Sequence, residues 1–427
     1  MNERSPRDDA RAAAAERYRA VRALSERLAE PLSAEDQGLQ SMPDASPTRW
    51  HLAHTSWFFE ALLLAPLQPG YAVFDPRFHY FFNSYYESLG PRQARPQRGL
   101  ISRPGSDEIR RYRAHVDAAV QRLVAGGDAA TWAAAAPLLE LGLNHEQQHQ
   151  ELILTDIKHA LAQNAFDPAY RAAPAASASP AAAAPAVAWC DFAGGEVAVG
   201  DAGAGFAYDN ERPRHAVLLR PYRLASRPVT CGEYLDFIDD GGYARAALWL
   251  SDGWTLAGEQ RGQAPLYWRR EADGSWSEFT LHGRRPLDPA APVCHVSFYE
   301  AAAYAAWAGA RLPTEFEWEA AVADLPVAGR WLDADVLRPL PATPGPGLRQ
   351  AFGDVWEWTR SAYDPYPGFQ PLTGAAAEYN GKFMVGQLVL RGGSCASPAG
   401  HLRASYRNFF PPAARWQFSG IRLARDA

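Results

Sequence analysis

The sequence has little cysteine for its length: its 427 residues include only Cys190, Cys231, Cys294 and Cys395. These four lie far apart and form no Cys-x-x-Cys pair, so neither a disulfide framework nor a thiolate zinc site is expected. Such sparse usage is typical of a reducing compartment, and we expect a cytoplasmic protein. The charged opening stretch, MNERSPRDDARAAAAERYRAV, does not predict a secretory signal.

Features of membrane and nucleic-acid proteins are also lacking. No run of about 18 apolar residues occurs, so no membrane span is expected. No Lys/Arg-rich run occurs either, and the formal net charge is −6, which gives no support to a nucleic-acid partner. With 47% hydrophobic and 21% charged residues over 427 positions, the chain is expected to be globular and to form two domains.

Over the first 164 residues, apolar residues recur at the spacing of helices. Apolar spacing predicts helices over residues 12–30, 46–67, 107–125 and 134–163. Ser46 followed by Pro47 is expected to start the second helix, and Ser106 to cap the third. Between them, residues 68–103 form a long crossover rich in Tyr, Phe and Arg, and crossovers of more than about 12–15 residues without regular structure are often functional. This order predicts a four-helix bundle, whose core is a common place for a metal.

The fourth predicted helix carries the strongest chemical signal. Within LNHEQQHQELILTD, His145 and His149 stand at i and i+4, so both imidazoles project from one face about one turn apart. Such a pair is half of a site for a divalent first-row metal, and Gln148 lies beside that face. The plainer interpretation is two histidines on a solvated helix face, so the hypothesis requires a third ligand.

The second predicted helix offers two candidates for that ligand. One apolar stripe combines Trp50, His54, Trp57 and Phe58. A histidine on such a stripe is more often a satisfied core residue than a ligand. His51 is rotated by roughly 60° from His54 and is the weaker candidate.

The composition changes after the helices. An Ala/Pro/Ser-rich stretch over residues 165–188 predicts a linker, and we place the domain boundary there. Beyond it, VAVG, AVLLRPYRLA and QLVLRGGS predict strands, and FYEAAAYAAWAGA predicts a helix. Residues 189–427 are therefore expected to form an α+β domain with many aromatic residues.

Several motifs of this second region resemble a known fold. They are PVCHVSFYEAAAYAAWAGARLPTEFEWEAA (292–321), GDVWEWT (353–359), RGGS (391–394) and RASYRNFF…GIRLAR near the end. Together they resemble the formylglycine-generating-enzyme/sulfatase-modifying-factor fold, a C-type-lectin-like domain. Formylglycine generation requires a reactive cysteine pair after RGGS. The aligned positions here are Ser397 and Leu402, and Cys395 is a single stray thiol, so that activity is not expected.

The helical region has its own resemblance. WHLAHTSWFFE and NHEQQHQELILTD are similar to the DinB-like metal bundle, in which one histidine of the second helix joins an H-x3-H pair of the fourth. The two domains in this order resemble the ergothioneine-biosynthesis sulfoxide synthases. The resemblance implies an α plus α+β protein, with a DinB-like four-helix bundle at 1–164, a linker at 165–188 and a C-type-lectin-like domain at 189–427.

The resemblance also implies a reaction. It predicts a hercynylcysteine S-oxide synthase, an oxidoreductase of EC 1.14.99 type that uses Fe(II) and O2 to join cysteine sulfur to imidazole C2 of hercynine (Nα-trimethylhistidine). The implied iron ligands are His54, His145 and His149. Three neutral ligands leave open positions for substrates and O2 on such an ion. Because metal binding needs neutral imidazoles, iron is expected to be lost in mild acid.

Further residues are implied around the metal. A tyrosine of the FNSYY segment, Tyr85 or Tyr86, is the expected proton donor, and the other is expected to be merely packed. The implied substrate-binding residues are Gln148 and Asn408, with Phe409, Phe410 and Trp416 as aromatic walls for the trimethylammonium group, and Arg92, Arg95 and Arg98 for the carboxylate of the thiol substrate. Each aromatic residue alone is more often a core residue than part of a cage, and each arginine could equally be a solvated surface charge.

One departure from the family concerns the thiol substrate. Members that use γ-glutamylcysteine tend to carry Asn-Trp-Asp where this chain has Asn408, Phe409 and Phe410. The missing acid favours free cysteine, with γ-glutamylcysteine as the alternative donor.

Three alternatives to this reaction each match part of the sequence. The first is an ovothiol-type synthase, which attaches cysteine to C5 of histidine. The sequence does not distinguish attack at C5 from attack at C2. HEQQH also fits the zincin HExxH with Glu146 as base, but that class needs a third ligand downstream, and His159 is the only nearby candidate. A binding module built on a degenerate bundle predicts missing ligands, whereas all three are present.

Overall fold

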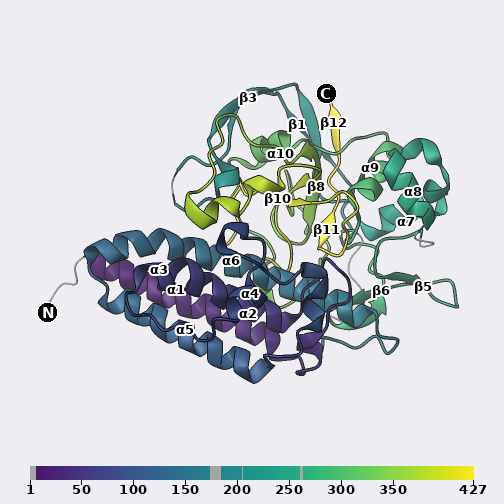
Figure 1. The fold of residues 1–427 in the computed structure, drawn as a ribbon. Coiled ribbons are helices and arrows are strands. Elements are labelled where there is room, and N and C mark those ends of the chain that lie inside the picture. The colour runs from purple at the N-terminus through teal and green to yellow at the C-terminus, as the bar shows by residue number, and fades with distance from the viewer. Residues whose placement is uncertain (1–5, 174–183, 204, 260–262) are drawn as a thin grey trace. The chain divides into compact units, whose positions relative to one another are not determined.

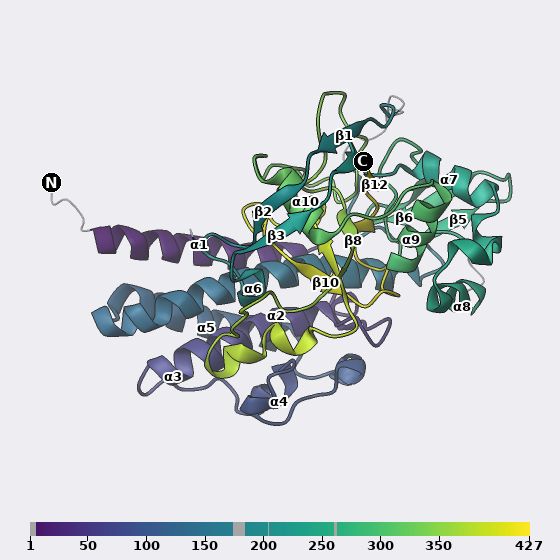
Figure 2. The same cartoon turned by 90° about the horizontal axis from the view of Figure 1, so that it is seen from above.

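The computed structural model describes residues 6–173, 184–203, 205–259 and 263–427. The chain divides into two compact units (Figures 1 and 2). The first combines Met1–Gln163 with the short segment Leu372–Tyr379, and the second combines Asn164–Pro371 with Asn380–Ala427. A piece of the C-terminal sequence therefore belongs to the helical unit, which the sequence analysis did not anticipate. Across the described ranges, no helix has both the length and the apolar character needed to cross a membrane.

The first unit is a helical bundle. Its helices are α1 (Pro6–Ala29), α2 (Thr48–Phe59), α3 (Ala65–Leu67), α4 (Phe78–Phe82), α5 (Ser106–Gly126) and α6 (Ala129–Ala162), and a π-helical turn (Glu60–Leu64) joins α2 to α3. The four long helices, α1, α2, α5 and α6, lie side by side in both views (Figures 1 and 2), and α2 packs against both α5 and α6. The predicted four-helix bundle is confirmed.

The predicted starts of the long helices need small corrections. Pro47 precedes α2 and Gly105 precedes α5, so neither Ser46 nor Ser106 is the cap residue. Helix α6 begins earlier than predicted because Asp128 caps it, with its side chain accepting a hydrogen bond from the backbone N–H of Thr131.

The crossover has more regular structure than the sequence predicts. Besides α4 it contains two 3₁₀ turns, Glu87–Leu89 and Arg95–Leu100. The rings of Phe78 and Phe82 lie 5.0 and 6.4 Å from the ring of Tyr112 on α5. This aromatic packing holds the crossover on the bundle, because rings at such spacing add attraction beyond their buried area.

In its described residues, the second unit is built from small sheets and four α-helices. The strands are β1 (Trp189–Phe192), β2 (Gly195–Val199), β3 (His215–Leu219), β4 (Tyr222–Ala225), β5 (Trp268–Arg270), β6 (Trp276–Thr280), β7 (Gly283–Pro286), β8 (Trp356–Ala362), β9 (Leu388–Arg391), β10 (Asn408–Phe410), β11 (Ser419–Gly420) and β12 (Ala424–Asp426). The helices are α7 (Cys231–Asp239), α8 (Ser251–Glu259), α9 (Phe298–Trp307) and α10 (Glu315–Val322). The sheet orders are β1-β4-β12, β10-β9-β8-β11, β2-β3 and β5-β6-β7. The predicted α+β class is confirmed.

The motifs of this unit have structural roles. Thr314 caps α10, because its hydroxyl accepts from the N–H of Glu317 while the Glu317 carboxylate accepts from the N–H of Thr314. Trp356 and Trp358 of the WEW motif are buried core rings. The stretch AVLLRPYRLA forms two strands rather than one: β3 pairs with β2, whereas β4 pairs with β1 and β12.

The described ranges include only part of the predicted linker. Residues 174–183 lie outside the described residues, and the described remainder of 165–188 forms no helix or strand.

Candidate metal centre

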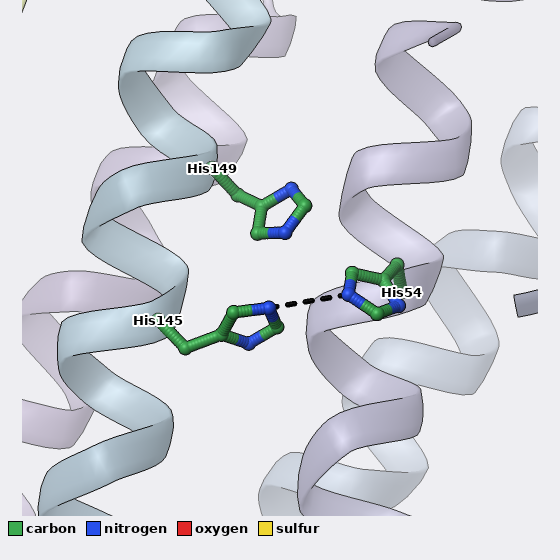
Figure 3. A group of neighbouring side chains, drawn as sticks. All are labelled: His54, His145 and His149. Atoms are coloured by element: carbon green, nitrogen blue, oxygen red, sulfur yellow. Dashed lines mark hydrogen bonds between the residues drawn. The ribbon is translucent and has the colours of Figure 1, made fainter. Parts of the chain in front are cut away.

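Three histidines meet inside the bundle (Figure 3). His54 comes from α2 and His145 and His149 from α6, and all three are buried. One ring nitrogen from each lies within 4.8 Å of the others, and the Nε2 atoms of His54 and His145 are 3.1 Å apart. The i, i+4 spacing puts the pair on one face of α6, and the packing of α2 against α6 supplies the third imidazole.

The surroundings of His54 set its orientation. Its imidazole is stacked with Trp50 at 4.6 Å and with Trp57 at 5.6 Å between ring centroids. Its Nδ1 is 2.6 Å from the backbone oxygen of Phe82, which can only accept a hydrogen bond. The proton of the neutral ring is therefore on Nδ1, and the lone pair of Nε2 faces the other two histidines.

The donor set fits a divalent first-row metal. Imidazole nitrogens suit iron and its neighbours, and a trio of neutral donors leaves coordination positions for substrates. Burial lowers the pKa of His145 to about 3. Burial, followed by neighbouring histidines, holds the pKa values of His54 and His149 well below the ordinary value. The lowered pKa values favour neutral imidazoles. We therefore expect the metal to be lost at a lower pH than the mild acid predicted from the sequence.

These lowered pKa values predict that acid destabilises the metal-free protein. Below about pH 6.5 the unfolded histidines bind protons that the folded ones do not, so the free energy of unfolding falls with pH, by up to about 1.4 kcal/mol per pH unit per histidine. Urea unfolding of metal-free protein at about pH 7.5, 6 and 5 measures this slope. A His145→Gln variant should show a shallower slope, and equal stability of the wild type at all three pH values would contradict the prediction.

A residue that the sequence analysis missed lies beside the cluster. Tyr379, from the segment Leu372–Tyr379, is buried, and its hydroxyl donates a hydrogen bond to the side-chain oxygen of Gln148. Its ring centroid is 5.6 Å from that of His145, in an edge-on arrangement. No spacing or motif in the single sequence connects Tyr379 to a helix 231 positions away.

The preceding residue ties this segment to the crossover. The carboxylate of Glu378 accepts hydrogen bonds from the backbone N–H groups of Glu87 and Ser88, each at 2.9 Å. This contact places Tyr379 next to the FNSYY segment, where the ring of Tyr85 lies 6.4 Å from that of Tyr379.

The two tyrosines predicted from FNSYY have different environments. Tyr86 is fully buried, and its ring lies 5.5 Å from Trp57 and 6.3 Å from Phe58. Tyr85 stacks on Tyr86 at 4.7 Å and is partly exposed. Tyr86 is therefore the packed member of the pair, and Tyr85 is the one beside Tyr379.

The three candidate arginines also differ. Arg92 pairs with Glu87 near the surface, and Arg95 donates to the backbone oxygen of Asp44. Arg98 is buried, and its guanidinium lies 3.4 Å from the centroid of Trp50. Burial, together with Arg95 and Arg92, holds the pKa of Arg98 well below its ordinary value, and its Nε has no hydrogen-bond partner in the described part of the chain. Of the three, Arg98 is the one that contacts Trp50, the ring stacked on His54.

The remaining predicted residues belong to the second unit. Asn408, Phe409 and Phe410 form the edge strand β10, which pairs with β9. The ring of Phe410 lies 5.4 Å from that of Trp416, edge-on, whereas Phe409 stacks on Tyr363 at 4.0 Å. The structure brings Phe410 and Trp416 together, and Phe409 packs on a different ring.

The zincin alternative does not fit the geometry. The carboxylate of Glu146 is held 2.9 Å from a guanidinium nitrogen of Arg22 and 3.1 Å from one of Arg113. Burial raises its pKa, but the two arginines outweigh burial and lower it to about 2, far from the value a general base needs near neutral pH. His159 hydrogen-bonds Ser41 and is not part of the cluster.

Each half of the chain matches a known protein family. The sulfatase-modifying factor enzyme 1-like domain matches residues 175–339 and 340–427, and the DinB superfamily matches residues 17–153. Hercynine oxygenase of Mycolicibacterium thermoresistibile is 37% identical over 423 residues, which cover 90% of this chain and 88% of that protein. Hercynine oxygenase of Mycobacterium tuberculosis is 36% identical over 414 residues, covering 90% and 92%. Formylglycine-generating enzyme of Streptomyces coelicolor is 31% identical over 287 residues, covering 55% and 88%.

Proposed function

The chain belongs to the hercynine oxygenase family of ergothioneine biosynthesis, and from this premise we propose that it is an Fe(II)- and O2-dependent sulfoxide synthase that acts on hercynine and cysteine. In the proposed reaction the cysteine S–H and the imidazole C2–H bonds are broken, an S–C2 bond forms, and sulfur gains one oxygen atom. O2 is the oxidant, and its second oxygen leaves as water with the two hydrogens. The observation that carries this proposal is the buried trio of histidines with its neutral ring nitrogens.

Iron fits His54, His145 and His149, and when bound there it supplies positions at which O2 and the substrates are held and activated. The protein's own contribution is enclosure and orientation. Trp50 and Trp57 stack with the imidazole of His54, and Phe58 lies 4.5 Å from His145 between ring centroids. Such apolar rings exclude water from the metal centre, which strengthens electrostatic interactions inside it.

Oxygen reduction requires protons, and a phenol next to the metal centre can deliver one. Tyr379 is the residue that the geometry favours, since its O–H already donates to Gln148 beside the histidines. Tyr85 is the second candidate because its ring neighbours that of Tyr379, and Tyr86 supports Tyr85 by packing. With substrate bound, the Gln148 amide is proposed to turn to the hercynine imidazole.

The charged ends of the substrates require different partners. A trimethylammonium group has no N–H to donate and is best held by aromatic faces, a role that we assign to Phe409, Phe410 and Trp416, with Asn408 holding another part of hercynine. The carboxylate of cysteine suits a guanidinium fork, and Arg98, buried against Trp50, is the foremost candidate ahead of Arg92 and Arg95.

We propose free cysteine as the thiol substrate, because no acidic residue accompanies Asn408 in strand β10 to hold a glutamyl amine. The sparse cysteines, none of them in a Cys-x-x-Cys pair, support a reducing cytoplasm in which cysteine is available.

The decisive experiment is anaerobic reconstitution with Fe(II), followed by O2, hercynine and either cysteine or γ-glutamylcysteine, with mass spectrometry of the products. We expect hercynylcysteine sulfoxide with cysteine, at least about tenfold less product with the dipeptide, equivalent to about 1.4 kcal/mol, and none without iron. Product only with γ-glutamylcysteine would reverse the assignment of the thiol donor. Product only when histidine replaces hercynine would favour the ovothiol-type reaction at C5, the alternative that the hercynine oxygenase relatives disfavour.

A further inference from the structure

A fourth buried histidine next to the metal centre has no role in the reaction proposed so far. His51, on the first turn of α2, has its Nδ1 2.8 Å from Nδ1 of His149. Its other nitrogen, Nε2, is 3.1 Å from Oδ2 of Asp156 on α6. The same carboxylate oxygen accepts a hydrogen bond from the backbone N–H of Ser46 at 2.8 Å. His51, His149 and Asp156 are all buried.

The hydrogen-bond donors and acceptors among Asp156, His51 and His149 can be assigned by starting from the carboxylate of Asp156. An ionised carboxylate only accepts hydrogen bonds, so the proton of a neutral His51 is on Nε2. The lone pair of His51 is then on Nδ1, which accepts a hydrogen bond from Nδ1–H of His149. A neutral His149 protonated on Nδ1 keeps its lone pair on Nε2. Figure 3 shows one nitrogen of the His149 ring turned toward His54 and His145.

We propose that His51 and Asp156 are positioning residues that fix the tautomer and the ring orientation of His149, so that its Nε2 is presented to the metal. This inference rests on the proposed metal centre and goes beyond it, because neither residue is a ligand. His51 cannot serve as a fourth ligand in this arrangement, since Asp156 occupies one of its nitrogens and the other faces the far side of the His149 ring.

The helix geometry accounts for the arrangement. Asp156 follows His149 by seven residues, about two turns, so both side chains leave α6 on the same face. His51 precedes His54 by three residues and is turned about 60° from it, so one turn of α2 supplies a ligand and a partner for another ligand. His54 has a comparable partner in the Phe82 backbone oxygen. Partners of this kind typically change metal affinity 10–100-fold when they are removed.

The first test reads the tautomer directly in the metal-free wild-type protein. Two-bond ¹H–¹⁵N correlation spectra of protein labelled at histidine distinguish protonated from unprotonated ring nitrogens, and a His149→Gln variant assigns the resonances. We expect His149 to be protonated on Nδ1 and unprotonated on Nε2. The reverse pattern would overturn the proposal, and folding of a positioning variant plays no part in this measurement.

The second test measures Fe(II) affinity by competition with a chelator, and the visible spectrum of the Co(II) form. His51→Phe and Asp156→Asn are expected to weaken Fe(II) binding about 10–100-fold and to alter the Co(II) spectrum. His51→Gln keeps a donor and an acceptor in place and is expected to restore most of the affinity. His159→Gln, on the same helix but hydrogen-bonded to Ser41, is the matched control and should bind iron normally.

Wild-type affinity in folded Asp156→Asn and His51→Phe variants would overturn the positioning role, as would a failure of His51→Gln to bind better than His51→Phe. If His51→Phe does not fold, the Fe(II) affinity of Asp156→Asn alone decides this test. Both readouts are made without substrates, so a wild-type protein that forms no sulfoxide would refute the proposed function while leaving these results intact.

Discussion

A His54→Gln variant is expected to lose tight Fe(II) binding and to form sulfoxide at least about 10³-fold more slowly than the wild type, since a bound metal supplies several kcal/mol of barrier lowering. His54 is the only ligand contributed by α2, so its loss leaves the two histidines of α6 as a half-site. The glutamine side chain is similar in length but cannot place an imidazole lone pair opposite Nε2 of His145, which lies 3.1 Å from Nε2 of His54.

Metal binding and folding can be separated in this experiment. Saturating Fe(II) at about 100 times its dissociation constant stabilises the wild type by about 2.7 kcal/mol, and the variant should gain almost none of this. His115→Gln is the matched control, because His115 is on α5 and hydrogen-bonds the backbone oxygen of Ala72. A His54→Gln protein that binds iron as tightly as the control, or that is stabilised equally by it, would show that the three-histidine site is wrongly assigned.

The metal centre shows where sequence patterns are informative and where they stop. The i, i+4 spacing of His145 and His149 marks a half-site because helix geometry alone brings the two rings together. Spacing alone could not decide the role of His54, since a packed histidine and a ligating one share the same stripe. In the structure both descriptions hold: the ring is stacked between Trp50 and Trp57, and it also faces the pair on α6.

What the sequence could not predict depends on contacts between distant segments. Serine is a common helix-cap residue, yet the backbone N–H of Ser46 instead donates a hydrogen bond to Asp156 on α6. No local sequence pattern links these two residues. The segment Leu372–Tyr379 lies within the sequence of the second unit but belongs to the helical unit. Its Tyr379 could be found only in three dimensions, whereas Tyr85 and Tyr86 were accessible through a recognisable motif.

Tyr379→Phe is the variant with the second large expected effect. If Tyr379 delivers the proton, the loss of its hydroxyl should lower the rate of sulfoxide formation by about 10²–10⁴-fold, the usual contribution of a general acid. Fe(II) affinity should stay within about twofold, because Tyr379 touches Gln148 and the edge of His145 but is not one of the three clustered histidines. Tyr71→Phe is the matched control, since its hydroxyl binds Glu60 instead.

Proton delivery must be distinguished from mere support of Gln148. A Gln148→Met variant breaks the same hydrogen bond but keeps the phenol, so a purely supporting tyrosine predicts equal losses in the two variants. A proton donor predicts that Tyr379→Phe lowers kcat far more and loses the solvent deuterium isotope effect on that step, whereas Gln148→Met mainly raises KM for hercynine. A large loss in Tyr85→Phe with near-normal turnover in Tyr379→Phe would transfer the role to Tyr85, the tyrosine whose ring lies 6.4 Å from that of Tyr379.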